Sequence, residues 1–167
     1  YMQRKGILDF IALARKMPQV QFLWFGYTDP HLVPHNVKAA MADAPENLRF
    51  PGFLSQAELR TAYCGADAFL FCSYEETEGI VVLEALACGI PTVVRDIPVY
   101  NGWLREGQNV YKASGTDEFQ QKVEGLLTGT LPDLTAAGRR EAEEADYNYC
   151  RRSRRVRVCV RTVWEAY

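Results

Sequence analysis

Four glutamates lie within ten residues of one another in this sequence, at Glu75, Glu76, Glu78 and Glu84. Carboxylates grouped in this way can accept hydrogens from a hydroxylated ligand, or can act as an acid and base pair. Acidic side chains near a helix start are also favoured by the helix dipole, which accounts for the first three without any ligand. Glu84 lies too far along the chain for that explanation.

Glu84 is the only charged residue in an otherwise apolar segment, residues 80–88. A helix that is apolar on all sides is normally buried. A buried carboxylate is costly unless a hydroxyl, a basic side chain or a ligand is paired with it. The sequence therefore leaves two interpretations of Glu84 open, a satisfied core carboxylate and a ligand contact.

The glutamates follow a short apolar segment, residues 68–72, which is typical of a parallel strand covered on both faces. Short apolar strands and helices alternate along the chain, and this order predicts an α/β fold with a Rossmann-like, doubly wound parallel sheet. Ligands bind at the carboxyl ends of the strands in such sheets. Ser55 and Glu58 have the spacing of a helix capping box. The expected helices span residues 7–17, 36–43, 56–64, 78–88 and 116–127, and the expected strands span 20–27, 47–50, 68–72 and 91–95.

Composition excludes several other classes of protein. A chain of 167 residues can form one domain with a substantial core. Its five cysteines show no C-x-x-C spacing, which favours reduced core thiols in a cytoplasmic protein.

His31 and His35 have no further metal-ligand pattern beside them, so we expect no metal site. P-loop, G-x-G-x-x-G and G-x-S-x-G motifs are absent, as is any apolar run of about 18 to 20 residues that could span a membrane.

The end of the chain is basic. Residues 146–167 contain six arginines against Asp146 and Glu165, a net charge of +4 that leaves −6 for the rest of a chain whose total is −2. Val156, Val160 and Val163 recur at helical spacing among these arginines, which predicts an amphipathic C-terminal helix over residues 146–167. Such a helix either docks on the domain or meets an anionic surface.

One extended motif resembles a known family. Glu76-Thr-Glu-Gly-Ile-Val-Val-Leu-Glu84, followed by Gly89-Ile-Pro91, resembles the E-x7-E signature of retaining glycosyltransferases with two Rossmann-like domains, the GT-B architecture of family four. Arg4-Lys5-Gly6, Trp24-Phe-Gly26 and Phe50-Pro-Gly52-Phe53 resemble further marks of that family in the same order. The amino-acid sequences of residues 73–80 and 99–112 are similar to those of bacterial diacylglycerol glucosyltransferases, which make membrane glycolipids.

The resemblance implies a role for each matching residue. The diphosphate of a nucleotide-sugar donor would lie against Lys5 and against the backbone amides at the helix start, where glycine permits close approach. Glu84 would accept hydrogen bonds from the ribose hydroxyls, and Glu76 would lie near the transferred sugar as the catalytic residue. Thr77 and Glu78 stand where the family has glycine and an aromatic residue, so the choice between Glu76 and Glu78 stays open. The implied donor-binding residues are Lys5, Gly52, Phe53, Glu76, Glu78, Gly79, Ile80, Val81 and Glu84. Among these, the backbone of Gly52 and Phe53 would hold the nucleotide base.

The implied function is that of one half of an enzyme. Residues 1–145 would be a nucleotide-sugar-binding domain with a truncated first strand, cut from a longer protein. Its N-terminal acceptor domain would be missing, so we expect no transfer by this chain alone. The expected reaction moves a hexose, glucose from UDP-glucose, to a lipid such as diacylglycerol at the inner face of the cell membrane. No cofactor, metal or nucleic acid is expected.

Three alternatives remain open at this point. The same donor half could serve a saccharide or small-molecule acceptor. A nucleotide-sugar epimerase shares the two-domain fold but lacks the E-x7-E element. In a non-enzymatic interaction domain, Glu84 would be a satisfied core carboxylate and no nucleotide sugar would bind.

Overall fold

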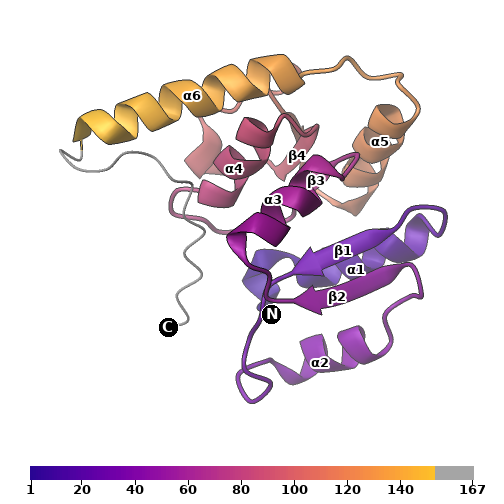
Figure 1. The fold of residues 1–167 in the computed structure, drawn as a ribbon. Helices are drawn as coiled ribbons and strands as arrows, with labels where there is room; N and C mark the ends of the chain where they lie inside the picture. Colours follow the sequence, from indigo (N-terminus) through magenta and orange to yellow (C-terminus); the bar gives the residue numbers. More distant parts are fainter. Residues whose placement is uncertain (153–167) are drawn as a thin grey trace.

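The computed structural model describes the backbone of residues 1–152 and the side chains of residues 1–145. Within that range the chain alternates helices and short strands, as Figure 1 shows. The strands are β1 (Phe22–Phe25), β2 (Leu48–Gly52), β3 (Phe69–Phe71), β4 (Thr92–Arg95) and β5 (Tyr111–Ala113). The α-helices are α1 (Ile7–Lys16), α2 (His35–Ala42), α3 (Gln56–Cys64), α4 (Ile80–Cys88), α5 (Thr116–Leu127) and α6 (Thr135–Arg152), and two short 3-10 helices are η1 (Gln3–Lys5) and η2 (Pro98–Tyr100).

All strand pairs are parallel, so the expected α/β class is confirmed. The strands form two ladders within the described residues, β1–β2 and β3–β4–β5, instead of one continuous sheet. The start of the chain packs closely against the end of β3: a Cβ atom at Gly6 would lie 2.1 Å from the carbonyl oxygen of Cys72, just past β3. The carboxyl end of β3 therefore lies near the turn from η1 into α1.

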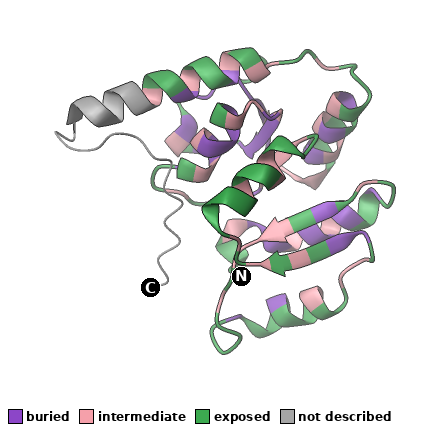
Figure 2. Ribbon diagram, viewed as in Figure 1, coloured by how far each residue is buried: buried purple, intermediate pink, exposed green. Residues whose placement is uncertain are grey.

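The helices form two layers, as a doubly wound fold requires. Helix α1 contacts α2 and α5, whereas α4 contacts α3 and α6. Two buried clusters correspond to these layers: one includes the inner face of α1 with Phe22 and Phe119, and the other includes Val82 and Leu86 of α4 with Tyr100. Buried residues accordingly concentrate on β4, β5 and the inner faces of α1, α4 and α5, whereas β1, β2 and β3 are largely intermediate or exposed (Figure 2).

Local sequence explains much of this structure. Apolar residues recur along α1 at the spacing that places Ile7, Phe10 and Ile11 on one buried face. The expected capping box at α3 is confirmed, because the Ser55 hydroxyl accepts a hydrogen bond from the Glu58 amide and the Glu58 carboxylate accepts one from the Ser55 amide. Asn47 is buried, and its side-chain amide donates to the carbonyls that end α1.

Two elements differ from the expectation. The short strand β5 lies beside β4, with Val93 in register with Tyr111, in a segment where the sequence pattern predicts no strand. Helix α6 begins at Thr135 and runs through residue 146, the boundary expected between the domain and the basic C-terminal helix. Figure 1 shows α6 lying along α4. Most of the expected helix over residues 146–167 falls outside the described residues.

Candidate functional site

The loop between β3 and α4 is tied to the start of the chain. The Tyr74 amide donates a hydrogen bond to the Arg4 carbonyl at 2.8 Å. The buried Ser73 hydroxyl lies 3.3 Å from the same carbonyl and 2.9 Å from the Glu76 Oε1 atom. Because a serine hydroxyl has one hydrogen to donate, these acceptors compete for it. The contacts hold the acidic loop at the carboxyl end of β3, where parallel sheets bind ligands.

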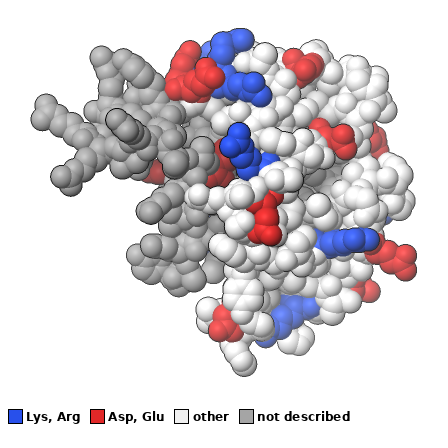
Figure 3. All heavy atoms as spheres, in the orientation of Figure 1, with Lys and Arg blue, Asp and Glu red and all other residues white. Residues whose placement is uncertain are grey.

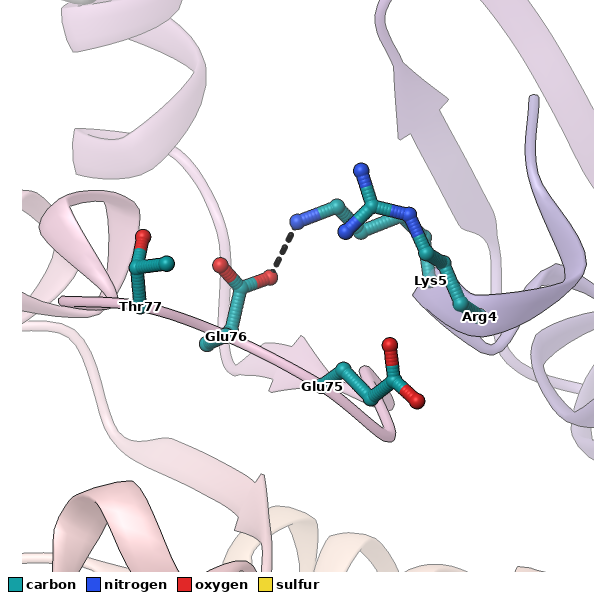
Figure 4. Close-up of a pocket in the computed structure, with 5 residues that line it drawn as sticks. All are labelled: Arg4, Lys5, Glu75, Glu76 and Thr77. Atoms are coloured by element: carbon teal, nitrogen blue, oxygen red, sulfur yellow. Dashed lines mark hydrogen bonds and ion pairs between the residues drawn. The ribbon is translucent and has the colours of Figure 1, made fainter.

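A pocket of about 410 Å³ opens between this loop and η1, lined by Arg4, Lys5, Glu75, Glu76 and Thr77. Figure 4 shows the Lys5 ammonium directed across the pocket at the Glu76 carboxylate, and the two form an ion pair. Both side chains are partly buried, so water screens their attraction less than it would on an open surface. The residues expected at the diphosphate and at the sugar are thus in direct contact with each other.

Helix α4 starts at this loop without a capping side chain. Its N-cap residue is Gly79, at a φ of 72°, a left-handed conformation that favours glycine. No side chain from the described residues caps the first turn, which leaves the amides of Ile80 and Val81 at the positive end of the helix dipole. An anion placed here would receive hydrogen bonds from backbone amides, as phosphates do at other helix starts.

Glu84 is buried in α4, with 5 % of its surface exposed. Neither of its carboxylate oxygens has a hydrogen-bond partner in the described part of the chain. Burial raises the pKa of Glu84 from 4.5 to about 7. A satisfied core carboxylate would have a protein partner, so this geometry favours a ligand contact.

A buried arginine supports the same loop from below. Arg95, at the end of β4, is 4 % exposed and forms an ion pair with Asp9 of α1. Its guanidinium also donates to the carbonyls of Cys72 (2.9 Å) and Ser114 (2.7 Å) and stacks 3.8 Å from the centre of the Tyr74 ring. This cluster joins α1, β3 and β5 beneath the acidic loop.

Comparison with known proteins identifies the family. The model of the family described as "Glycosyl transferases group 1" matches residues 2–144. The chain belongs to this family. Within it, the chain is 46 % identical over 125 residues to the processive diacylglycerol alpha-glucosyltransferase of Acholeplasma laidlawii, an alignment that covers 75 % of this chain and 38 % of that protein. It is 38 % identical over 127 residues to the alpha-galactosylglucosyldiacylglycerol synthase of Streptococcus pneumoniae, covering 72 % of this chain and 33 % of that protein.

A solved structure also has a similar fold. The HepE protein of Anabaena, in complex with UDP-glucose, superposes with a TM-score of 0.74 at 17 % sequence identity, covering 86 % of this chain and 42 % of that one. This confirms the expected Rossmann-like half of a GT-B fold. The chain therefore spans about a third of the length of the two relatives and less than half of the structural neighbour.

The remaining residues expected in the group 1 donor site lie outside the pocket. Gly52 ends β2 at a φ of 82° and accepts a hydrogen bond from the Gly26 amide, and Phe53 after it is 67 % exposed. Glu78 is exposed, unlike Glu76. Ile80 is half exposed and Val81 partly buried, but their predicted contacts involve the backbone. The pocket brings Lys5 and Glu76 together and does not include Gly52, Phe53 or Glu84.

Sequence reasoning assigned no role to the residues that position this candidate site. Ser73, Asp9 and Arg95 act through contacts with residues distant in sequence, and no short motif marks such contacts. A signal was available for Arg95, since it is a charge at the carboxyl end of the expected strand 91–95. The described residues contain no cluster of three or more His, Cys, Asp or Glu side chains placed to bind a metal.

Proposed function

We propose that this chain is the donor-binding half of a retaining glycosyltransferase that transfers glucose from UDP-glucose to a lipid acceptor such as diacylglycerol. The observation that carries the donor site is Glu84, a buried carboxylate with no protein partner in the described residues, on the helix that follows the loop in which Glu76 pairs with Lys5. Membership of the glycosyl transferases group 1 family supports a glycosyltransferase over an epimerase or an interaction domain.

The geometry supports a distinct role for each group. Lys5 and the first amides of α4 bind the diphosphate and offset the charge that grows on the leaving group. Glu84 accepts hydrogen bonds from the ribose hydroxyls. These hydroxyls are the partners that a buried carboxylate requires. Glu76 lies in the pocket and contacts the sugar, whereas Glu78 is exposed. Gly52 and Phe53 hold the base at the end of β2.

The acceptor is proposed from the relatives, because residues 1–145 carry the donor site. Both relatives described above are named for products or acceptors that contain diacylglycerol. The identity of 46 % over most of this chain supports a lipid acceptor over a free saccharide or small molecule. Acceptor binding belongs to an N-terminal domain, so we propose that this chain binds the donor and catalyses no transfer by itself.

Contact with the membrane would be peripheral, at its inner, cytoplasmic face. None of the described helices has the length and apolarity that crossing a bilayer requires. Basic and acidic side chains alternate on the described part of the face in Figure 3 and form no basic patch there. The proposed attraction to anionic lipid therefore rests on the arginines of residues 146–167.

Calorimetric titration of the chain with UDP and UDP-glucose tests the donor site. We expect binding that weakens by about tenfold or more in the Glu84→Gln variant, since a neutral amide replaces the charged acceptor of the ribose hydroxyls. Glu143→Gln, which changes an exposed carboxylate on α6, is the matched control and should bind like the wild type. Absence of UDP binding to the wild-type chain would overturn the proposal.

The acceptor is tested with vesicles that contain diacylglycerol and radiolabelled UDP-glucose. The full-length protein should form a labelled glycolipid, and the Glu76→Gln variant of that protein should lose this activity. The isolated chain should form none. Transfer to a water-soluble saccharide but not to diacylglycerol would reject the lipid acceptor while leaving the donor site intact.

A further inference from the structure

Tyr100 is a buried tyrosine whose hydroxyl has no partner. It ends η2 after β4, none of its surface is exposed, and its ring packs edge-on against Trp103 at 5.6 Å between centroids. No hydrogen-bond partner for the hydroxyl exists among the described residues. Tyr111, by contrast, donates from its hydroxyl to the Pro132 carbonyl at 2.7 Å. Burial of a hydroxyl without a partner is unfavourable, so the Tyr100 hydroxyl requires an explanation.

The hydroxyl lies beside Gly79, the N-cap residue of α4. A Cβ atom at Gly79 would lie 3.2 Å from the Tyr100 oxygen and 2.9 Å from a carbon of its ring. Gly79 is therefore required twice, for its left-handed backbone and for the space that Tyr100 occupies. Burial raises the pKa of the Tyr100 hydroxyl, and the nearby Glu76 carboxylate raises it further. The group stays protonated and can donate a hydrogen bond at any physiological pH.

The unpartnered groups of this chain converge on one helix. Within the described residues, the buried side-chain oxygens and nitrogens without a partner belong to two residues, Glu84 and Tyr100. Glu84 is on α4, and Tyr100 packs against the start of α4. One is an acceptor and the other a donor, so they suit different parts of the same ligand. A carboxylate suits sugar hydroxyls, whereas a hydroxyl donor beside helix amides suits an anion.

We propose that the Tyr100 hydroxyl donates a hydrogen bond to the diphosphate of the nucleotide-sugar donor at the start of α4. This inference rests on the proposed function, because it assigns a further residue to the same donor site. An anion bound to the first amides of α4 lies next to Gly79, the residue that Tyr100 contacts. The hydroxyl then supplements Lys5 in balancing the diphosphate charge.

The Tyr100→Phe variant tests the inference by removing one oxygen atom. A hydrogen bond to a charged phosphate predicts about 10- to 100-fold weaker UDP binding to this variant, measured by calorimetry. Its urea unfolding midpoint should match or exceed that of the wild type, since the lost hydroxyl has no partner in the free chain. If Tyr100 serves packing alone, UDP affinity will not change, and the inference is overturned.

Tyr111→Phe is the matched control and should show the opposite pattern. It loses a hydrogen bond to Pro132, so its unfolding midpoint should fall while its UDP affinity stays at the wild-type value. The wild type separates the two proposals. If it binds UDP and Tyr100→Phe binds equally well, the role of Tyr100 is wrong and the donor site stands; if the wild type binds no UDP, both fail.

Discussion

Lys5 and Glu76 form an ion pair across the pocket, although 71 residues separate them in the chain. Lys5 ends η1, and Glu76 lies in the loop between β3 and α4. In the proposed function one binds the diphosphate and the other contacts the sugar. When no nucleotide sugar is bound, each side chain therefore has the other as its ionic partner. A nucleotide-sugar donor must compete with this ion pair.

This competition predicts an asymmetry between two variants. Lys5→Ala should weaken UDP binding by about tenfold or more, because a charge-assisted contact to phosphate is lost. Glu76→Gln should bind UDP several-fold more tightly than the wild type, because Lys5 no longer has a charged partner to leave. Calorimetry with UDP measures both. Lys16→Ala, which removes an exposed ion pair with Asp117, is the control and should change nothing.

The raised pKa of Glu84 predicts how stability depends on pH. With a pKa of about 7 in the folded chain against 4.5 ordinarily, folded Glu84 holds a proton that the unfolded chain has released. The free energy of unfolding should therefore fall as pH rises from about 4.5 to about 7, by up to about 3 kcal/mol. Glu84→Gln should lose this part of the pH dependence. Urea unfolding at several pH values measures it, and parallel curves for the two proteins would contradict the prediction.

Donor binding should show the opposite trend with pH. The ribose hydroxyls donate to an ionised Glu84, so UDP binding requires the proton to leave. UDP affinity should rise as pH increases through about 7 in the wild type, where Glu84 titrates. The Glu84→Gln variant should bind weakly and without that rise. The secondary ionisation of the phosphate also occurs near this pH, and it contributes equally to both proteins, so the difference between them is the quantity to measure.

Arg95 should be among the residues most sensitive to substitution. Arg95→Ala leaves Asp9 without its ionic partner, with only the Tyr74 hydroxyl still donating to it, and removes donors from the carbonyls of Cys72 and Ser114. Breaking a buried ion pair in this way costs about 3 to 5 kcal/mol, to be measured by urea unfolding. Arg15→Ala breaks an exposed pair with Asp43 and should cost less than about 1 kcal/mol. Equal losses in the two variants would show that the Arg95 cluster is not structural.

Gly138 tests whether α6 belongs to the same domain as α4. A Cβ atom there would lie 2.7 Å from the Leu86 side chain of α4 and 3.0 Å from the Asn109 carbonyl. Gly138→Ala should therefore destabilise the chain by about 1 to 3 kcal/mol, although alanine favours helices more than glycine does. Thermal unfolding measures this change. A more stable variant would mean that α6 does not pack on α4 as described.

The sequence predicted the elements that depend on local patterns and missed those that depend on distant partners. Helix α5 matches its expected bounds because an amphipathic pattern and a polar start are both local signals. Strand β5 has three residues with a lysine at its centre, and pairing with β4 alone makes it a strand. Helix α6 has little apolar surface to reveal it, since Ala142 and Gly138 make its close contacts.

The candidate site shows the same division. Glu84 could be recognised from sequence because one charge in an apolar helix is a local anomaly. Tyr100 could not, because tyrosine is ordinary in a loop and only the fold reveals that its hydroxyl lacks a partner. The pairing of Lys5 with Glu76 was also unforeseen, since the resemblance assigned the two residues to different parts of the donor.

The division of the strands into two ladders has a consequence for how the chain fluctuates. The ladder β1–β2 has only two strands and shares no strand hydrogen bonds with β3–β4–β5 in the described residues. A two-stranded ladder is marginal by itself, so its amide protons should exchange with solvent faster than those of β4, which is paired on both sides. Gly52 and Phe53 end the weaker ladder. A donor whose base lies there and whose ribose reaches Glu84 would bridge both ladders, so its binding should slow exchange in β2.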